Sequence, residues 1–390
     1  MPKKLDEILK GKKAGAQDAG KSKKLAAIQA AVAAMQKKFG TESVNYLGNK
    51  RPEPLPRFSS GSIALDKILG GGYPEGRMIE VVGEASTGKT TLCYHALAEC
   101  QRKYPDDWCG FVDSEQSFDP QYAEAVGVNV GELVTAQPDT GTDAFGMVQG
   151  MIEAGAKLIV VDSVAAMMPK EEAEEEDYAH NSVGAQARMM SKGLRKLTAI
   201  AGKNKCTLMF TNQLRTKIGV LYGDPSVAAG GKALGYYASV IMRLSSGGKV
   251  KATIDGEEQV TAIETHVTTA KNKTAAPFRK CTLVIEFGKG IDNDAGVIDI
   301  AIGAGFIQKK GGWYAIDGKN IAQGMIKLKE YLEQNPVIYA EIKAKTEEFI
   351  RNEKADEAVS EQQVDAEAMT DDEIAAAAMR DDDAAEEGEV

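Results

Sequence analysis

One short glycine-rich segment restricts the fold of this chain more than any other feature of the sequence. Residues Gly83–Thr90 read Gly-Glu-Ala-Ser-Thr-Gly-Lys-Thr and match the pattern G-x4-G-K-[S/T]. The segment follows a β-rich run, Met78–Val82, and leads into a helix-forming stretch, Thr90–Tyr104. Glycines between a strand and a helix let backbone N–H groups close round phosphates at the positive end of the helix. The segment therefore predicts a phosphate-binding loop.

The residues of this loop have separate expected roles at ATP and its Mg²⁺ ion. Lys89 is expected to reach the β- and γ-phosphates, and the Thr90 hydroxyl to coordinate Mg²⁺. The set assigned to the nucleotide in this segment is Gly83, Glu84, Ala85, Ser86, Thr87, Gly88, Lys89, Thr90 and Thr91.

Two later strands end in carboxylates that suit such a site. The apolar run Leu158–Val161 closes on Asp162, which is expected to lie beside the phosphate loop and hold Mg²⁺ through water. Glu115 follows the strand Gly110–Asp113, where a carboxylate can orient a water for attack on the γ-phosphate. Asp113 competes for that role, and the pattern alone leaves both residues open.

Strand and helix signals alternate through the middle of the chain. Such alternation predicts an α/β fold with a mostly parallel sheet and helices on both faces. Before it, residues 22–39 show helical spacing of apolar residues, and after about residue 230 shorter strands are expected. A small α/β unit is expected to follow from Val297. The strands predicted in the two parts are Met78–Val82, Gly110–Asp113, Leu158–Asp162 and Thr207–Thr211, then Val240–Leu244, Val267–Thr269 and Leu283–Phe287.

Charge is unevenly distributed along the 390 residues, which carry a net charge of −10. Residues 353–390 hold fifteen Asp or Glu against two Lys or Arg, whereas the first forty residues hold ten Lys against three acids. A basic start and an acidic, aromatic-free end predict a polyanionic partner and an internal competitor for its site. Residues 353–390 are expected to be disordered.

Several protein classes are disfavoured by composition. The five cysteines have no metal-like spacing, which indicates free thiols in a reducing compartment. No apolar run is long enough for a secretion signal or a membrane span. The cytoplasm is the expected location, with no membrane partner.

Seven segments of the sequence form a recognisable set when they are taken together and in order. They are the phosphate loop, Asp113–Tyr122, Gln137–Gly141, Val161–Ala166, Ala187–Ser191, Asn212–Gly219 and Lys271–Phe278. With them, the chain resembles the bacterial RecA recombinases over about residues 22–350. Several of these motifs are specific to the recombinases rather than to phosphate-loop proteins in general.

The resemblance implies a protein that forms a filament on single-stranded DNA, with ATP hydrolysed between adjacent subunits. It further implies homology search and strand exchange with double-stranded DNA, in recombination and repair, and a possible co-protease role in the response to DNA damage. Four regions follow: a basic N-terminal extension with a polymerisation helix and linker (1–60), a RecA-type ATPase core with DNA-binding loops (61–290), a small C-terminal α/β domain (291–352) and the acidic tail (353–390).

Individual roles are carried over only where this sequence matches the family motif. Glu115 is implied as the catalytic carboxylate, and Asp119 and Tyr122 as contacts to adenine. The resemblance implies that Gln213 senses the γ-phosphate. Lys271 and Lys273 would reach the ATP of the neighbouring subunit and stabilise charge there, as an arginine finger does.

Two segments are expected to contact single-stranded DNA. Arg188, Ser191 and Arg195 share one helical face and match family positions that contact phosphates. The segment Leu214–Ala229 combines basic and apolar residues, as suits a flexible loop that grips the backbone and inserts between bases. The DNA-binding residues assigned in and after this loop are Arg215, Lys217, Ile218, Gly230, Gly231 and Lys232.

The sequence departs from the family most clearly at its second, duplex-holding DNA site. Four positions that are usually basic are Ser245, Ser246, His266 and Thr268 here, and Lys249 and Lys251 in the adjoining hairpin are candidates to replace them. Smaller departures are Lys232 and Tyr236 in place of the usual Asn and Phe, and an acidic first DNA loop, 171–182, one residue longer than usual.

Three other functions are compatible with a phosphate loop. A ring-forming helicase or repair ATPase would share the loop and Asp162, but the pairing of Gln213-Leu-Arg215 with Lys271-Asn-Lys273 favours the recombinase. A nucleotide kinase would need an acceptor pocket and an arginine-rich lid, which the sequence lacks. A DNA-coating protein with a vestigial ATP site would not need both Lys89 and Glu115.

Overall fold

The computed structural model describes residues 23–41, 43–44, 46, 54–173, 184–216, 226–228, 232–254 and 256–367. The chain forms two compact units, Met1–Leu55 and Pro56–Val390. In the first unit a helix covers residues 23–39, which confirms the N-terminal helix expected from the sequence. It ends at Gly40, whose φ of 100° lies in the left-handed region that glycine adopts readily.

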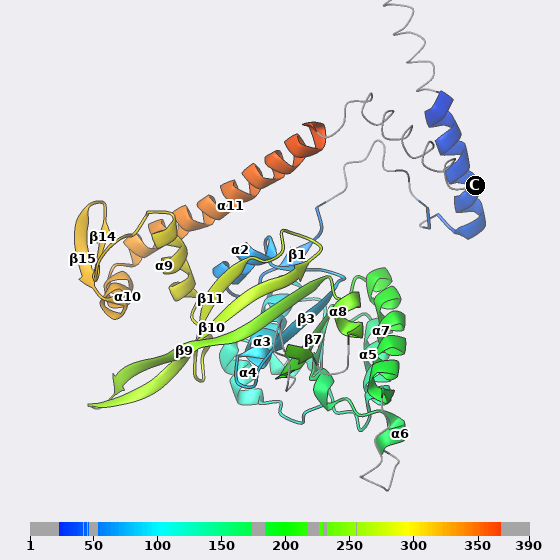
Figure 1. Cartoon of the computed structure of the whole chain (residues 1–390), viewed down its shortest axis with the longest axis horizontal. Helices are drawn as coiled ribbons and strands as arrows, with labels where there is room; N and C mark the ends of the chain where they lie inside the picture. The colour runs from blue at the N-terminus through cyan, green and yellow to red at the C-terminus, as the bar shows by residue number, and fades with distance from the viewer. Residues whose placement is uncertain are drawn as a thin grey trace, which may run out of the picture. The chain divides into compact units, whose positions relative to one another are not determined.

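The second unit is built on one large sheet that is parallel through its centre (Figure 1). The strand order is β12-β11-β10-β9-β3-β7-β6-β4-β5, and β8 pairs with β7 off this path. This arrangement confirms the predicted α/β fold. The strands of the parallel part are β3 (Met78–Gly83), β4 (Cys109–Asp113), β5 (Leu133–Ala136), β6 (Leu158–Asp162), β7 (Thr207–Thr216) and the first third of β9 (Val240–Ile254).

The central strands are largely apolar because both faces of the sheet are covered. In β6, Leu158 and Val160 pack into one core cluster, whereas Ile159 and Val161 pack into a second cluster on the other face. Successive side chains of a strand point to opposite faces, so a strand covered on both sides needs apolar residues on both. The carboxylate of Asp162 ends this strand.

Helices form the two covering layers. One layer contains α2 (Ile63–Leu69), α3 (Lys89–Lys103) and α4 (Pro120–Val126); the other contains α5 (Gly141–Glu153), α7 (Ala185–Asn204) and α8 (Ala233–Tyr237). Local signals fix their ends. The Asp119 side chain accepts hydrogen bonds from the backbone N–H groups of Gln121 and Tyr122, and Pro120 occupies the first turn of α4.

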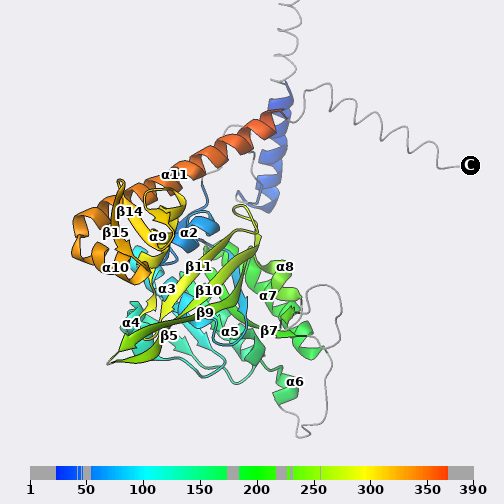
Figure 2. The same cartoon turned by 60° about the vertical axis from the view of Figure 1, so that its left-hand side comes forward.

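Beyond β9 the sheet continues as antiparallel strands, β10 (Glu257–Asn272), β11 (Lys280–Glu286) and β12 (Gly290–Ile291). The sequence predicted strands here but made them too short, because β9 and β10 both continue well beyond their predicted ends. β9 and β10 pair with each other from Val240–Asn272 to Ile254–Glu257, so they form a hairpin that extends past the rest of the sheet (Figures 1 and 2). Polar β-branched residues such as Thr253 and Thr261 allow both strands to continue where cover is lost.

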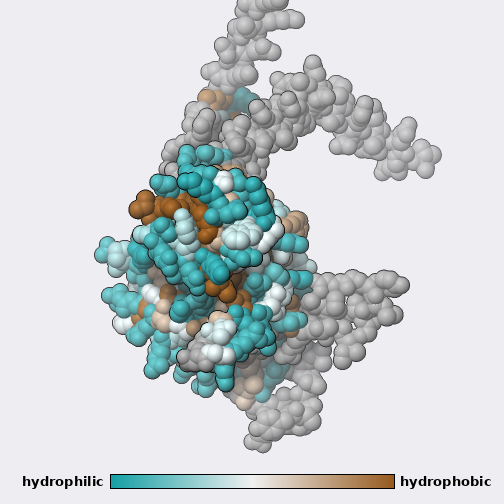
Figure 3. Space-filling model, turned by 90° about the vertical axis from the view of Figure 1, so that its left-hand side faces the viewer, coloured by the Kyte–Doolittle hydropathy of each residue, from teal (hydrophilic) through white to brown (hydrophobic). Residues whose placement is uncertain are grey.

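A smaller group of elements follows, with its own apolar cluster. Its sheet has three strands, because Gln308–Lys310 and Lys319–Gln323 both pair with Trp313–Ile316. Figure 3 shows this side of the molecule as largely hydrophilic with one hydrophobic patch. The elements are α9 (Asn293–Gly303), β13 (Gln308–Lys310), β14 (Trp313–Ile316), β15 (Lys319–Gln323), α10 (Met325–Gln334) and α11 (Pro336–Glu367).

Helix α11 corrects the predicted start of the disordered tail. Disorder was expected from residue 353, but the helix continues to Glu367. Residues 337–387 contain neither glycine nor proline and are rich in Ala, Glu, Lys and Gln, which are good helix formers. The rest of the acidic segment, 368–390, lies outside the described residues. Among those described, no helix is both long and apolar enough to cross a membrane.

Candidate nucleotide site and DNA-facing surfaces

The phosphate loop leaves β3 at Gly83 and enters α3 at Lys89, as the sequence predicts. Gly88 has a φ of 86°, and a Cβ atom placed there would lie 2.3 Å from Cδ1 of Ile285. A Cβ at Gly83 would lie 2.7 Å from the carbonyl oxygen of Leu244. The neighbouring strands therefore approach the loop so closely that both positions require glycine. The Thr265 hydroxyl also donates to the Thr87 carbonyl at 3.2 Å.

A pocket of about 560 Å³ opens over this loop. Strands β4, β6 and β7 and the start of α4 bring most of the predicted site residues to its walls. The predicted residues that line it are Ala85, Ser86, Gly88, Lys89, Thr90, Thr91, Glu115, Asp119, Tyr122, Asp162 and Gln213. Of the remaining loop residues, Gly83, Glu84 and Thr87 support the loop without lining the pocket, as their contacts with Leu244, Lys89 and Thr265 show.

Sequence reasoning missed one wall of the pocket. Ile263 of β10, Ile285 of β11, and Phe287 and Gly288 after β11 line it from the antiparallel strands. Phe287 is 56% exposed. Alternation of apolar residues around Ile263 was the available signal, but it does not by itself place these strands over the loop.

Lys89 lies at the centre of the charged groups. Its Nζ donates to the carbonyl oxygens of Glu84 at 2.7 Å and Gly83 at 3.2 Å. Burial lowers the pKa of Lys89, and the nearby carboxylates of Asp162 and Glu115 oppose that shift. A cation held among carbonyls at a helix N-terminus is suited to meet phosphate oxygens.

Asp162 and Thr90 form an oxygen pair that fits Mg²⁺. The Thr90 hydroxyl donates to Asp162 Oδ2 at 2.7 Å, and the Thr211 hydroxyl holds the other carboxylate oxygen. Burial raises the pKa of Asp162, and both hydroxyl contacts oppose that shift. Mg²⁺ prefers a few protein oxygens together with water and phosphate oxygens. The described residues contain no cluster of three or more candidate ligand side chains from His, Cys, Asp and Glu.

Asp113 and Glu115 have different surroundings. Asp113 is 1% exposed, and its two carboxylate oxygens accept the backbone N–H groups of Ser117 at 3.1 Å and Phe118 at 3.0 Å. It therefore stabilises the turn after β4. Glu115 lines the pocket, and its Oε1 accepts a hydrogen bond from Gln213 Nε2 at 2.9 Å. Of the two acids, only Glu115 can face a nucleotide in this pocket.

Tyr122 and Asp119 lie at the end of the pocket formed by α4. The Tyr122 hydroxyl is 2.9 Å from the Thr91 hydroxyl, and its ring contacts Tyr94 with the centroids 5.8 Å apart. This packing fixes the Tyr122 ring beside the pocket, where a base could stack on it. Asp119 uses one oxygen to cap α4.

Lys271 and Lys273 do not line the pocket of their own chain. Lys271 lies on β10, where its Nζ donates to the carbonyl oxygens of Gly235 at 2.6 Å and Tyr236 at 3.2 Å, at the end of α8. Lys273 follows that strand, and its backbone N–H donates to the Ser239 carbonyl at 2.8 Å. Both lysines are therefore separate from the phosphate loop of the same chain.

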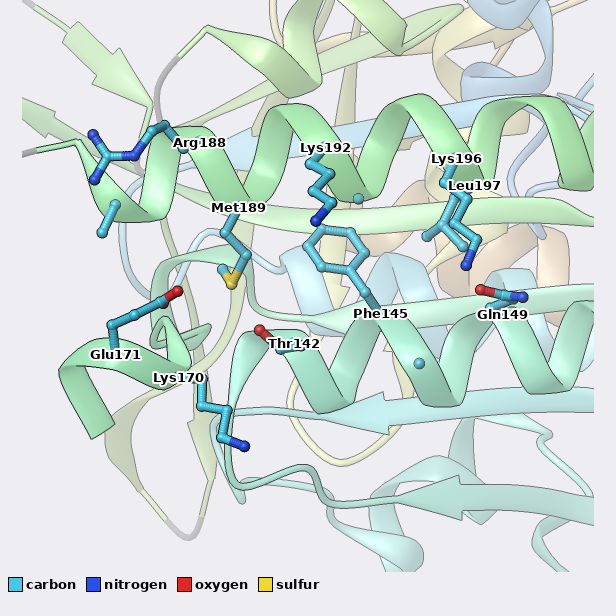
Figure 4. A pocket seen from close by; sticks show the side chains of 13 residues that line it. Thr142, Phe145, Gln149, Lys170, Glu171, Arg188, Met189, Lys192, Lys196 and Leu197 are labelled. Carbon is cyan, nitrogen blue, oxygen red and sulfur yellow. The ribbon is translucent and has the colours of Figure 1, made fainter. Parts of the chain in front are cut away.

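The predicted DNA contacts on α7 (Ala185–Asn204) lie between its first turn and its middle. Arg188 and Arg195 are exposed, and the Ser191 hydroxyl donates to the Ala187 carbonyl at 2.8 Å. Beside them a groove of about 650 Å³ runs between α5 and α7. Figure 4 shows Phe145 of α5 pointing toward α7 beneath Lys192. A Cβ at Gly193 would lie 2.6 Å from the Phe145 ring, so glycine is needed for this contact.

The second predicted DNA segment is only partly described. Lys217, Ile218, Gly230 and Gly231 lie outside the described residues. The loop was expected to begin at Leu214, but β7 continues to Thr216 and pairs with β8 (Ser226–Ala228), with Arg215 opposite Val227. Thr216 and Val227 are β-branched, which favours this extension. Lys232 is exposed at the start of α8.

The four positions predicted from the sequence to belong to a second DNA site lie on adjacent parts of β9 and β10. Ser245 is opposite His266, Ser246 is opposite Thr265, and Thr268 lies between Arg243 of β9 and Lys280 of β11. Lys280 is exposed and was not identified from the sequence, because its position opposite Thr268 depends on strand register.

The two candidate replacement lysines differ in their surroundings. Lys251 forms an ion pair with Glu258 at 2.7 Å, whereas Lys249 lies opposite Ile263 and is exposed. The ion pair offsets much of the charge that Lys251 could offer to a phosphate.

Comparison with known proteins agrees with this geometry. A family model described as the RecA N-terminal domain matches residues 26–292, and one described as the RecA C-terminal domain matches residues 295–351. Protein RecA of Desulforapulum autotrophicum is 43% identical over 326 residues, covering 83% of this chain and 92% of that protein. Protein RecA of Acinetobacter baylyi is 40% identical over 352 residues, covering 90% and 98%, and that of Marinobacter nauticus is 42% identical over 342 residues, covering 87% and 96%.

Proposed function

The chain belongs to the RecA family, and we propose that it is a DNA-dependent ATPase that forms a filament on single-stranded DNA and exchanges strands with a homologous duplex. The observation that carries the proposal is the hydrogen bond from Gln213 to Glu115 above the phosphate loop. This bond connects Glu115, the carboxylate that would orient the water, with β7, the strand that leads into the predicted DNA-binding segment. The residue that would respond to the nucleotide and the residues that would contact DNA therefore lie on or next to the same strand.

The residues of the pocket divide the work of hydrolysis. Lys89 and the backbone of the loop bind the β- and γ-phosphates, and Thr90 and Asp162 would hold Mg²⁺, which neutralises charge on the phosphates when bound. Glu115 orients a water in line with the γ-phosphate and accepts its proton as the bond to ADP breaks. Tyr122 stacks on the adenine, and Asp119 contacts it.

The neighbouring subunit completes the site in this proposal. Lys271 and Lys273 lie away from the phosphate loop of their own chain, and in the filament they would stabilise charge on the ATP of the next subunit. Gln213 would exchange its bond with Glu115 for one to the γ-phosphate and pass that change along β7 toward Arg215, Lys217 and Ile218. Arg188, Ser191 and Arg195 would hold the DNA backbone.

Electron microscopy and a strand-exchange assay test this function together. The protein is mixed with circular single-stranded DNA and a non-hydrolysable ATP analogue, and we expect helical filaments. With ATP and a homologous linear duplex, we expect joint molecules and transfer of one strand. Closed rings, or filaments that never exchange strands with ATP, would contradict the proposal; a heterologous duplex is the matched control.

A further inference from the structure

A buried carboxylate, Glu80, lies between the nucleotide-facing end of β7 and the lysine on β10. It is 3% exposed and sits in the middle of β3, where a charged side chain is costly without partners. Its Oε1 accepts a hydrogen bond from Asn212 Nδ2 at 2.9 Å, and the Asn212 Oδ1 accepts the backbone N–H of Gln213 at 2.9 Å. Two hydrogen bonds therefore link Glu80 through Asn212 to the backbone of Gln213.

Strand register places Glu80 in line with Lys271. Glu80 is adjacent to Ile241 of β9, and Ile241 is adjacent to Lys271 of β10. Neighbouring residues in register point to the same face of a sheet, so both side chains lie on the face that α8 covers. A Cβ at Gly235 of α8 would lie 4.0 Å from Glu80 Oε2, and Lys271 Nζ donates to the carbonyl of this same Gly235.

The two charged groups interact across this covered face. Burial and the neighbouring Lys273 lower the pKa of Lys271, and Glu80 opposes that shift. Burial raises the pKa of Glu80, and Asn212 and Lys271 oppose it. In the part of the chain that the structure describes, the bonds of the Lys271 amine go to backbone carbonyls, so Glu80 acts on it through charge.

We propose that Glu80 is a positioning residue, which holds Lys271 charged and in place at the end of α8 so that it can act on the ATP of the neighbouring subunit. The inference rests on the shared active site of the proposed function. Asn212 fixes the Glu80 carboxylate, and because Gln213 follows Asn212, the nucleotide state of one subunit can reach the lysine that this subunit offers to the next.

Mixed filaments distinguish this role from a structural one. Alone, Glu80→Gln should lower DNA-stimulated ATP turnover roughly 10- to 100-fold, because a misplaced group costs that much even when chemistry is otherwise intact. ATP-analogue binding and single-strand binding should stay within about twofold, since the phosphate loop is untouched. Mixed with Glu115→Gln subunits, Glu80→Gln should recover turnover, because some junctions then pair an intact phosphate loop with an intact Lys271. Mixed with Lys271→Ala subunits, it should not recover.

Three controls decide the other outcomes. Glu75→Gln neutralises another buried acid, which contacts Lys103 and Lys157 away from the pocket, and it should not lower turnover. Glu80→Asp keeps the charge and should retain more turnover than Glu80→Gln, even if the latter folds poorly. Lys271→Ala mixed with Glu115→Gln should recover turnover.

If Lys271→Ala mixed with Glu115→Gln recovers turnover but Glu80→Gln mixed with Glu115→Gln does not, the proposed role of Glu80 is wrong and the shared site stands. No recovery in that control overturns the shared site, and the Glu80 proposal with it. Equal turnover of Glu80→Asp and Glu80→Gln would also contradict a role that depends on charge.

Discussion

The nucleotide pocket and the three neighbouring strands β9, β10 and β11 hold their functional side chains in different ways. In the pocket, Thr90, Asp162 and Thr211 are joined by hydrogen bonds, and Gln213 holds Glu115. On the three strands, Lys249 and Lys280 are exposed, and strand register sets their spacing. Both regions would meet phosphate groups, but in the pocket the functional side chains are fixed by one another.

The difference follows from what each region must do. Hydrolysis needs a water, a carboxylate and a phosphate in one geometry, so each side chain is fixed by another. Holding a DNA backbone needs positive charge near a regular row of phosphates, and several arrangements of Lys and Arg provide it. The pocket should therefore lose function abruptly when one residue changes, and strands β9, β10 and β11 should lose it by increments.

The largest effect is expected at the phosphate loop. Lys89→Ala should abolish measurable ATP binding and lower DNA-stimulated turnover by at least roughly 10³-fold, since it removes a buried, charge-assisted bond to phosphate. Lys103→Ala, at the other end of α3, is the matched control and should keep turnover within about twofold. Nucleotide fluorescence and phosphate release measure the two. Binding that survives in Lys89→Ala would show that the pocket tolerates single losses.

The next effect separates the two acids after β4. Glu115→Gln should lower turnover by roughly 10²-fold and leave ATP-dependent DNA binding intact, because only orientation of the water is lost. Asp113→Asn should instead lower the free energy of unfolding by about 1–3 kcal/mol, because an amide cannot accept both backbone N–H groups of Ser117 and Phe118. Single-turnover kinetics and thermal unfolding measure the pair. Normal hydrolysis by Glu115→Gln would rule out this assignment.

An intermediate effect is expected on strands β9, β10 and β11. Lys249→Ala with Lys280→Ala should reduce the slope of log duplex affinity against log salt by about 1.8, or about 0.9 for each phosphate that the protein no longer neutralises. Strand exchange should fall, while single-strand binding and its ATP turnover stay nearly intact.

Lys251→Ala is the comparison for that double variant. The sequence alone pointed to Lys251 beside Lys249, but its ion pair with Glu258 should make its removal nearly silent. A larger slope change for Lys251→Ala than for Lys280→Ala would show that the ion pair opens on DNA.

The smallest effect is expected from the acidic end of the chain. Residues 368–390 carry nine Asp or Glu against one Arg, and α11 ends at Glu367, so a stop after this residue keeps the helix. Truncation there should strengthen duplex binding about threefold at low salt, with the gain lost as salt screens the charges. Duplex titrations across a salt series measure it. A gain that persists at high salt would point to an interaction other than charge.

The nucleotide pocket was also easier to predict from the sequence than the positions on β9, β10 and β11. The loop Gly83–Thr90 and the carboxylate at Asp162 were predicted because each is tied to a buried strand whose apolar run is visible in one dimension. The choice between Asp113 and Glu115 needed the turn after β4, where backbone N–H groups occupy one of them.

Features that depend on pairing between distant strands could not be predicted. Ile263 and Ile285 reach the nucleotide pocket, and Lys280 lies opposite Thr268, only through the register of β10 and β11. Strand β5 was missed because Leu133–Ala136 is short and only partly buried at the edge of the sheet. The last turns of α11 were predicted to be disordered because they are too charged to resemble a packed element.

The two faces of β10 can accumulate mutations independently of each other. Ile263, Thr265 and Val267 point inward, toward the pocket, the carbonyl of Thr87 and the core, whereas His266 and Thr268, which alternate with them, point outward. A change on the outer face leaves the inner face in register, because successive residues of a strand point to opposite faces. Natural selection could thus remodel duplex capture in this lineage while ATP hydrolysis was preserved, with no strand gained or lost.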